Sequence, residues 1–504
     1  MISKQMEEHP RSFGVPKLLR LMVLAISIAA FLKAEPAEAQ QRKAIQPNTR
    51  YLLFQIFTSY RKIGVDVFPP AGQIESTVQD ITTRIGTTGD QKNKLGICLG
   101  PLTLGDSEEE VCKVIREGFD IAKKNDVAIA FHIDDQMFWE NSKGNEDRKD
   151  SKALNSRDNI EWIDWNGTES TGRRLDWSEH PTKIAPPLCV NSGAVQVAVK
   201  ARAQLIGHEL KKQVANLRRE GKEHLYAGII AGWESMIGTD FATGKHTGYH
   251  ALSNKGFSAA NPPIRIDLEL SQILKQFIEL WAKQLVEAGA PPDKIFCHIA
   301  FTPQGLGRTD VKVTERMGFA TPDIAFSKWY QPGFSLYPEG NTLEVIREHL
   351  QKHGAPYWAM SEGTNVVPNG MPGEPRMESY LAKLFNHGAV TANIYSWGIG
   401  GNAERERNIF RRATENPEAL NAYRKLLKGE TLTEAPKTKA AFSSELLREK
   451  IDRIQRQLPA WVNGKPERMQ IAKSMMERLE RALKSNKFQQ ADTAADEALK
   501  LLTK

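Results

Sequence analysis

Two glutamates stand at the ends of short apolar runs and could do paired acid–base chemistry. The run 226–231 is followed by Gly-Trp-Glu-Ser, which places Glu234 just beyond it, and the run 357–360 is followed by Ser361 and Glu362. Acidic side chains rarely occupy the ends of buried strands without a partner or a task. If both strands end at one face, the carboxylates meet in one cleft, which is the arrangement that hydrolysis of a glycosidic bond requires.

A second group of polar side chains ends another apolar run. His132, Asp134 and Asp135 are followed by Trp139, and His298 ends a later run. Carboxylates accept hydrogen bonds from sugar hydroxyls, and aromatic faces stack on apolar sugar faces, so this group suits substrate binding. The alternative is a metal site made of the histidines and aspartates. Adjacent aspartates on a strand point to opposite faces, which argues against one ion held by both.

Aromatic residues recur near other expected strand ends. Trp233 directly precedes Glu234, Trp329 and Tyr330 follow the expected sixth strand, and Trp397 follows the eighth. A single aromatic residue there is commonly part of the core. Their repetition at strand ends favours a shared aromatic-lined cleft, so we expect these four side chains to contact substrate.

The elements that must position these residues alternate along the chain. Eight apolar runs, mostly without polar alternation, are typical of strands buried on both faces of a parallel sheet: 51–58, 95–102, 127–133, 227–231, 294–301, 323–327, 356–360 and 392–396. Amphipathic helices are predicted from about 106, and over 193–219, 264–288, 342–352 and 376–387. The pattern predicts an α/β fold, a (β/α)8 barrel. The alternative, a doubly wound sheet, lacks a glycine-rich turn after the first strand.

One connection is much longer than the others. Residues 134–192, between the third strand and its helix, are rich in Asp, Asn, Ser, Trp and Pro. Long connections of this kind often form part of a binding site. In a barrel this insertion would lie at the C-terminal face of the strands, where active sites are built.

The two strand-end glutamates resemble those of the clan A glycoside hydrolases, a large group of (β/α)8 retaining glycosidases. The resemblance covers roughly residues 45–425 and includes the segment Asn-Ile-Tyr-Ser-Trp at 393–397. It implies Glu234 as acid/base and Glu362 as nucleophile, acting through a covalent glycosyl-enzyme intermediate. It also implies Trp397 as the floor of the sugar site. The clan usually has asparagine before its acid/base glutamate, whereas this chain has Trp233.

Two alternatives to this hypothesis remain open at the level of sequence. One is a carbohydrate-binding barrel without catalysis, which would keep the aromatic residues but not need both glutamates. The other is a metal-dependent hydrolase that uses His132, Asp134 and His298. The two-carboxylate mechanism needs no cofactor, and we expect none. The identity of the sugar, the linkage and the oligomeric state are not indicated by the sequence.

The two ends of the chain differ from the middle. Residues 1–39 have the features of a secretory signal: Lys17 and Arg20, an apolar stretch over 21–32, and Ala-Glu-Ala at 37–39. We therefore expect a secreted or periplasmic protein. The barrel should span 40–429, a polar linker 430–442, and an appendage of amphipathic helices 443–504.

Composition excludes several other classes of protein. The chain has 504 residues and a formal net charge of +7, with basic residues spread among acidic ones, so we expect no binding to nucleic acid. Beyond residue 39 no segment is long and apolar enough to cross a bilayer. The four cysteines lack the spacing of a metal site, and free thiols are favoured over disulfides in a domain of this size.

Overall fold

The computed structural model describes most of the expected barrel and the C-terminal helices. The described residues are 49–58, 74–175, 182–301, 319–336, 342–363, 377–395, 397, 413–434, 444–462, 466–484 and 488–502. The expected signal segment 1–39 and residues 435–442 of the expected linker lie outside this part. Trp177, a tryptophan of the long connection, and the glycine-rich segment 398–401 after the expected eighth strand lie outside it as well. The domain boundaries and the export of the chain therefore stay predictions.

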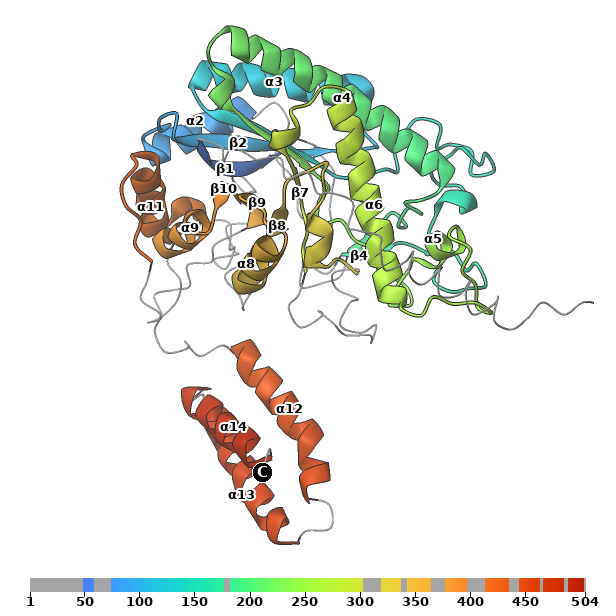
Figure 1. Ribbon diagram of the computed structural model, residues 1–504, viewed down its shortest axis with the longest axis vertical. Helices are drawn as coiled ribbons and strands as arrows, with labels where there is room; N and C mark the ends of the chain where they lie inside the picture. Colours follow the sequence, from blue (N-terminus) through green and yellow to red (C-terminus); the bar gives the residue numbers. More distant parts are fainter. Residues whose placement is uncertain are drawn as a thin grey trace, which may run out of the picture. The chain divides into compact units, whose positions relative to one another are not determined.

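The chain folds as a (β/α)8 barrel. One sheet contains eight parallel strands in the order β7-β6-β3-β2-β1-β10-β9-β8. Parallel bridges from Phe296 to Gln331 and from Ile299 to Phe334 bring β7 toward β8, so the sheet nearly closes on itself (Figure 1). The strands are β1 (Arg50–Phe57), β2 (Asn93–Leu102), β3 (Ala128–Ile133), β6 (Tyr226–Ala231), β7 (Ile295–Cys297), β8 (Gly333–Ser335), β9 (Trp358–Gly363) and β10 (Ala389–Ile394).

Helices pack around the outside of the strands (Figure 1). The barrel helices are α2 (Ile74–Ile85), α3 (Glu108–Asn125), α4 (Gly193–Arg219), α6 (Ile266–Glu287), α8 (Thr342–Lys352), α9 (Met377–Asn386) and α11 (Pro417–Leu427), and the short α5 (Tyr249–Ser253) lies in the connection between β6 and α6. Short 3-10 helices are η2 (Arg157–Asn159), η3 (Glu223–Leu225), η4 (Pro292–Lys294) and η6 (Pro322–Ala325). Figure 1 shows α3, α4 and α6 covering adjoining sides of the strands.

Local signals explain why the elements begin where they do. Ser107 caps α3: its hydroxyl accepts from the Glu110 amide, and the Glu110 carboxylate accepts from the Ser107 amide in return. Such a cap stabilises a helix by about 1 kcal/mol. The buried face of α3 carries Val111, Ile115 and Phe119, which join the main core between helices and sheet. The helix expected from residue 106 is thus confirmed.

The sixth barrel strand lies later in the chain than the sequence predicted. The segment 323–327 is not a strand, because Pro322–Ala325 form η6, and the strand is β8. Proline at the first helical position favours a helical turn, and a three-residue strand leaves no apolar run to detect. As a consequence, Trp329 and Tyr330 precede the sixth strand instead of following it.

The long connection after β3 contains a small hairpin. Strands β4 (Arg173–Leu175) and β5 (Thr182–Ile184) pair antiparallel inside it. The connection is anchored to the segment that follows β6: the Glu161 carboxylate accepts from the amides of Gly248 and His250, and the Trp162 ring stacks on His250 at 4.0 Å. Both segments leave the C-terminal ends of their strands, so the insertion packs at the face where the sequence analysis placed it.

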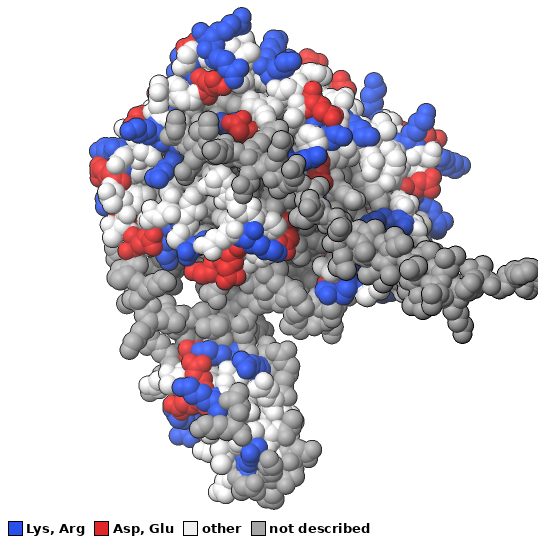
Figure 2. Space-filling view, viewed as in Figure 1, with Lys and Arg blue, Asp and Glu red and all other residues white. Residues whose placement is uncertain are grey.

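The last three described helices share an apolar cluster of their own. They are α12 (Ser444–Val462), α13 (Pro466–Lys484) and α14 (Phe488–Leu502). Leu447, Ile454 and Leu479 are buried there together with alanines of α14. None of the helices in the described part of the chain has the length and apolar character needed to cross a membrane. On the face drawn in Figure 2, basic and acidic side chains are interspersed.

Candidate active site

The barrel brings the two strand-end glutamates together. Glu234 lies just beyond β6, the fourth barrel strand, and Glu362 lies in β9, the seventh. Three atoms lie within 4.8 Å of one another: a carboxylate oxygen of Glu234, a carboxylate oxygen of Glu362 and a ring nitrogen of His298. The exposed fractions of Glu234 and Glu362 are only 8% and 4%. The barrel therefore places two carboxylates side by side in a largely buried site at the ends of its strands.

A sharp turn of the backbone aims Glu234 inward. Gly232 has φ 96° and Glu234 itself has φ 48°, in the left-handed region that residues other than glycine rarely occupy. Asp135 holds this turn: its carboxylate accepts from the Trp233 amide at 3.2 Å and from the Ser235 hydroxyl at 2.5 Å. Asp135 therefore positions the turn that carries Glu234. Strain of this kind is concentrated at functional sites, where the surrounding contacts maintain it.

His298 and Ser335 fix the carboxylate of Glu234. The Glu234 amide donates to His298 Nδ1 at 3.3 Å, which makes Nδ1 the acceptor and leaves the proton on Nε2. His298 Nε2 then donates to Ser335 Oγ at 2.7 Å, and the Ser335 hydroxyl donates to Glu234 Oε1 at 2.9 Å. The chain of hydrogen bonds starts at the Glu234 backbone and returns to its side chain, so it restricts the rotamer of that residue.

A buried layer of polar side chains supports His298 from below. His132 Nε2 lies 3.0 Å from His298 Nδ1 and 3.1 Å from the Gly232 carbonyl, within hydrogen-bond distance of both. Gln55 contacts His132 Nδ1 at 3.0 Å and accepts from Asn393. Burial, and then the neighbouring His298, lower the pKa of His132 well below its usual value. Burial also lowers the pKa of His298 to about 3, so both imidazoles are neutral near pH 7.

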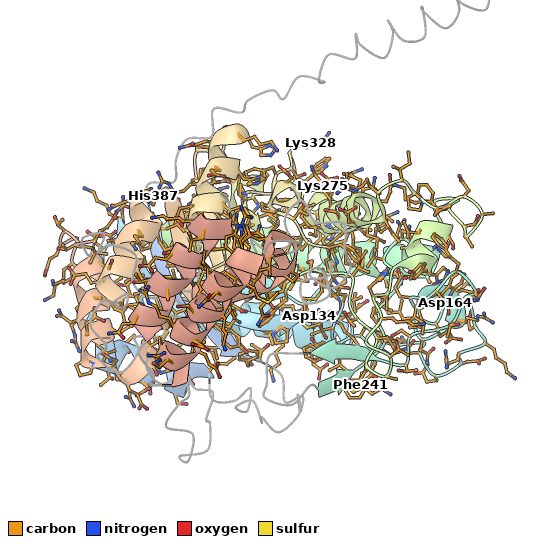
Figure 3. The ribbon with its side chains drawn as sticks, turned by 90° about the horizontal axis from the view of Figure 1, so that it is seen from below. Asp134, Asp164, Phe241, Lys275, Lys328 and His387 are labelled. Carbon is orange, nitrogen blue, oxygen red and sulfur yellow. The ribbon has the colours of Figure 1, made fainter. Side chains whose placement is uncertain are left out.

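Asp134 caps the turn that follows β3. Its two oxygens accept from the backbone amides of Gln136, Met137 and Phe138 at 2.8–3.1 Å. Burial, and then the adjacent Asp135, raise the pKa of Asp134 to about 7. Figure 3 shows Asp134 near the strands in the middle of the view, whereas Asp164 of the same insertion lies toward the edge.

An aromatic cluster stands beside the carboxylates. The Trp233 ring stacks on His132, with centroids 4.1 Å apart and planes within 1° of parallel. Phe57 packs against Trp233 and against Tyr395, each at 5.5 Å. Together with Met137 these side chains form a separate apolar patch at the strand ends. Phe57 and Tyr395 were missed as candidates. Both follow or end strands in the sequence, but alternation alone does not tell which side of the barrel wall an aromatic residue faces.

Four of the predicted substrate contacts lie elsewhere. Trp139 is buried in the main core and donates to the Pro186 carbonyl. Trp397 packs edge-on against Phe54 and donates to Asp80 of α2, so it lies between the barrel and its helices. Trp329 and Tyr330 lie at the other end of the sixth strand, where the Tyr330 hydroxyl donates to the Ile324 carbonyl. Contact of these four residues with substrate therefore stays a prediction.

Four polar residues that the sequence suggested as substrate contacts are fully buried and bind protein atoms, so in the structure they support the site. They are His132, His298, Asp134 and Asp135. For these residues the sequence analysis found the correct region of the barrel. It did not distinguish a side chain that contacts substrate from one that holds another side chain. Burial of a polar group requires a partner, and here the partners come from distant strands.

One charged residue of the site was missed. Arg173, in β4 of the insertion, is 1% exposed, and its three guanidinium nitrogens find no hydrogen-bond acceptor among the described residues. Burial lowers the pKa of Arg173, and the carboxylates of Asp134, Asp135 and Glu234 act in the opposite direction. The guanidinium thus offsets the negative charge collected at the mouth of the barrel. No sequence pattern distinguishes Arg173 from the other arginines of the insertion.

The part of the chain that the structure describes contains two groups of side chains able to hold a metal ion. They are Glu234 with His298 and Glu362, and Asp323 with His349 and His353. The aspartates that the sequence suggested as ligands belong to neither, because backbone amides and Ser235 occupy their oxygens. The four cysteines are all free, and Cys98 and Cys297 lie in strands as expected.

Comparison with known proteins finds similarity at the level of structure only. No protein-family model matches the chain, and no curated protein matches it. The chain is similar to the catalytic domain of β-amylase from Paenibacillus polymyxa, with TM-score 0.42, 10% identity, and coverage of 68% of this chain and 92% of that one. It is also similar to a family 5 xyloglucanase from Paenibacillus pabuli, with TM-score 0.39, 10% identity, and coverage of 77% of this chain and 100% of that one. A third similar structure is the GH26 endo-β-1,4-mannanase of Bacillus sp. JAMB-750, with TM-score 0.39, 11% identity, and coverage of 76% of this chain and 88% of that one.

Glycoside hydrolases of families 5 and 26 are thus among the structures that this chain is similar to. With TM-scores below 0.5, these similarities assign the chain neither to a family nor to an activity.

Proposed function

We propose that this protein is a glycoside hydrolase that cleaves a poly- or oligosaccharide with retention of configuration. The observation that supports this most strongly is the pair formed by Glu234 and Glu362, which come from distant barrel strands and have oxygens within 4.8 Å. This spacing is near that of a nucleophile and an acid/base residue on one glycosidic bond. It leaves too little room for the water that an inverting enzyme places between its carboxylates.

Glu362 is the nucleophile in this proposal. It extends from β9 into the mouth of the barrel and attacks the anomeric carbon as the leaving group departs, forming a glycosyl-enzyme ester. Glu234 gives its proton to the glycosidic oxygen and then removes a proton from the water that cleaves the ester.

The aromatic patch supports a carbohydrate as the substrate. Tyr395 is partly exposed and packs on Phe57 beside Trp233, at the strand ends that also carry the carboxylates. Sugar rings present apolar C–H faces that stack on such side chains. Trp233 takes the position where the clan A enzymes usually have asparagine, so we propose that the 2-hydroxyl of the sugar is held in a different way here.

The test is product release from a broad panel of polysaccharides, oligosaccharides and aryl glycosides. Glu234→Gln should lower turnover by about 10²- to 10⁴-fold, the range of general acid catalysis, and Glu362→Gln should lower it at least as much. Circular dichroism should show both variants folded, because glutamine keeps the shape of the side chain. Turnover that survives both substitutions would refute the proposal. A ligand bound equally by wild type and Glu362→Gln, with no turnover in either, would identify a binding barrel without catalysis.

A second candidate, a metal-dependent hydrolase, is favoured by one observation: His298 lies within 4.8 Å of both carboxylates. Against it, both ring nitrogens of His298 already take part in hydrogen bonds, to the Glu234 amide and to Ser335. Activity after treatment with EDTA separates the two functions. The two-carboxylate mechanism keeps its turnover, whereas a metal-dependent hydrolase loses it and regains it when the ion is restored.

A further inference from the structure

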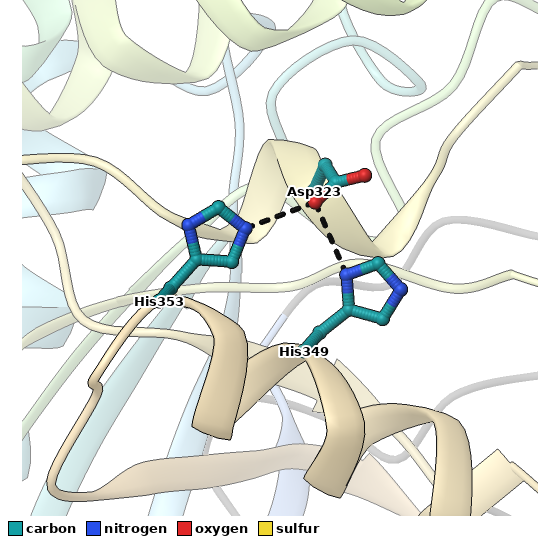
Figure 4. Close-up of side chains that lie close together, drawn as sticks. All are labelled: Asp323, His349 and His353. Carbon is teal, nitrogen blue, oxygen red and sulfur yellow. Dashed lines mark hydrogen bonds and ion pairs between the residues drawn. The ribbon is translucent and has the colours of Figure 1, made fainter. Parts of the chain in front are cut away.

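A second cluster of metal-ligating side chains lies beside β8, apart from the carboxylate pair. Asp323 belongs to η6, which precedes this strand, and His349 lies in α8, which follows it (Figure 4). His353 comes one helical turn after His349, just past the end of α8, and its amide donates to the His349 carbonyl. Residues four apart on a helix share a face, so both imidazoles reach the same carboxylate.

The three ligand atoms are nearly in position for one ion. His349 Nδ1 lies 3.1 Å from Asp323 Oδ1, and His353 Nε2 lies 2.9 Å from the same oxygen. All three atoms are within 4.8 Å of one another. In a tetrahedral zinc site with bonds of about 2.0–2.1 Å, neighbouring ligand atoms are about 3.3 Å apart. The two distances to Asp323 Oδ1 are thus a few tenths of an ångström shorter than in such a site.

The cluster is ordered by packing and open to solvent. The His353 ring stacks on Phe326 at 4.0 Å with 14° between the planes, which fixes its orientation. The exposed fractions of the side chains are 50% for Asp323, 18% for His349 and 32% for His353. A hydrated ion can thus enter from solvent and keep a water molecule as its fourth ligand.

A lysine competes for the same oxygen. Lys352 Nζ lies 2.8 Å from Asp323 Oδ1, but its side chain is 60% exposed, and such ion pairs contribute little. Burial alone would raise the pKa of Asp323, but hydrogen bonds from Lys352 and His353 outweigh it and lower the pKa to about 2. Lys352 is thus the cation that an incoming metal ion has to displace from Asp323.

We propose that Asp323, His349 and His353 form a zinc-binding site that clamps η6 to α8. Two imidazoles and one carboxylate are a ligand set that zinc accepts. The ion joins the segment before β8 to the helix after it. Since β8 carries Ser335, which hydrogen-bonds Glu234, the clamp stabilises the strand that supports the candidate catalytic residue. The site's role is structural, and it does not depend on the proposed glycosidase activity.

Calorimetric titration of the full-length protein with Zn²⁺ tests the site. The double variant His349→Ala/His353→Ala should weaken this binding event by at least about tenfold, because it removes two of the three ligands. Lys352→Met should strengthen it, since the competing cation is gone. Glu234→Gln should leave the event unchanged, which distinguishes it from binding at the carboxylate pair. The melting temperature of the wild type should rise with Zn²⁺, and that of the double variant should not.

If the double variant does not fold, Asp323→Asn takes its place, because this substitution keeps the shape and removes only the charge. An isotherm and a melting shift that are the same in wild type and in the ligand variants would overturn the proposal. Loss of binding in Glu234→Gln alone would also overturn it, by assigning the ion to the barrel mouth.

Discussion

Several separate restraints converge on Glu234. Its backbone has φ 48°, its amide and its carboxylate both join the hydrogen-bond chain through His298 and Ser335, and Asp135 holds the residues on either side of it. A positive φ costs about 1–2 kcal/mol for a side chain other than glycine. These contacts offset that cost and aim one carboxylate at another, which is the kind of preorganisation that catalysis requires.

Removing the Ser335 hydroxyl tests this preorganisation at the scale of one residue. Ser335→Ala breaks a hydrogen bond to a carboxylate, a contact of about 1.5–3 kcal/mol, so we expect kcat to fall by about 10- to 100-fold. KM should change little. Ser361→Ala is the matched control, because this buried hydroxyl donates to the Cys297 carbonyl and not to a carboxylate. Equal loss of kcat in both variants would show that Ser335 acts only on stability.

At the scale of elements, the turn after β6 needs glycine at 232. A Cβ there would lie 2.2 Å from Ser235 Oγ, which cannot rotate away without losing its bond to Asp135. Gly232→Ala should therefore cost about 1–3 kcal/mol beyond the penalty of its positive φ, and should displace Glu234. Gly244→Ala provides the control, because φ is 65° there and nothing lies within 4 Å of the added Cβ. Denaturant unfolding and turnover measure both effects; equal losses of stability would contradict the account.

The anchor of the long insertion should be sensitive to pH. Burial raises the pKa of Glu161 to about 7, above its value of about 4.3 in an unfolded chain. The folded state binds this proton more tightly, so the free energy of unfolding should fall as pH rises from about 4 to about 7, by up to roughly 3 kcal/mol. Glu161→Gln keeps an oxygen for the amides of Gly248 and His250 but does not titrate. The free energy of unfolding of Glu161→Gln, relative to that of the wild type, should therefore increase as pH rises from about 4 to about 7. Parallel stability curves would show that Glu161 is not the titrating group.

Most elements of the barrel could be predicted because continuous apolar runs and helical periodicity are local signals. The helices at 193–219 and 342–352 match the structure to the residue. The sixth strand could not be predicted, since Gly333–Ser335 is too short to show a pattern and the apolar segment before it folds as η6. For the same reason Trp329 and Tyr330 were assigned to the wrong end of that strand.

At the scale of the whole molecule, the candidate site depends on closure of the barrel. One hydrogen-bonded layer of polar side chains joins strands from around the barrel. It contains Gln55 in β1, Asn393 in β10, and His132, His298 and Ser335. The sequence predicted which strands end in carboxylates, and closure then made their meeting a geometric consequence. It could not predict the supporting layer or Arg173, because those contacts depend on which side of each strand faces the barrel interior.

The C-terminal helices should be separable from the barrel. Helices α12–α14 bury Leu447, Ile454 and Leu479 among themselves. A chain ending at residue 434 should therefore keep the turnover and the melting temperature of the full-length protein, because domains with their own cores fold independently. Loss of both in the shortened chain would show instead that the helices complete the barrel, and would contradict the division at residues 430–442.

The account's central claim is that Glu234 and Glu362 act as acid/base and nucleophile at one glycosidic bond. The most direct test is ¹H NMR of the first product released from a glycan or aryl glycoside that the protein cleaves. Carboxylate oxygens within 4.8 Å predict that the new anomeric centre has the configuration of the substrate. A product of inverted configuration would contradict the account, since inversion needs carboxylates about 6.5–9.5 Å apart.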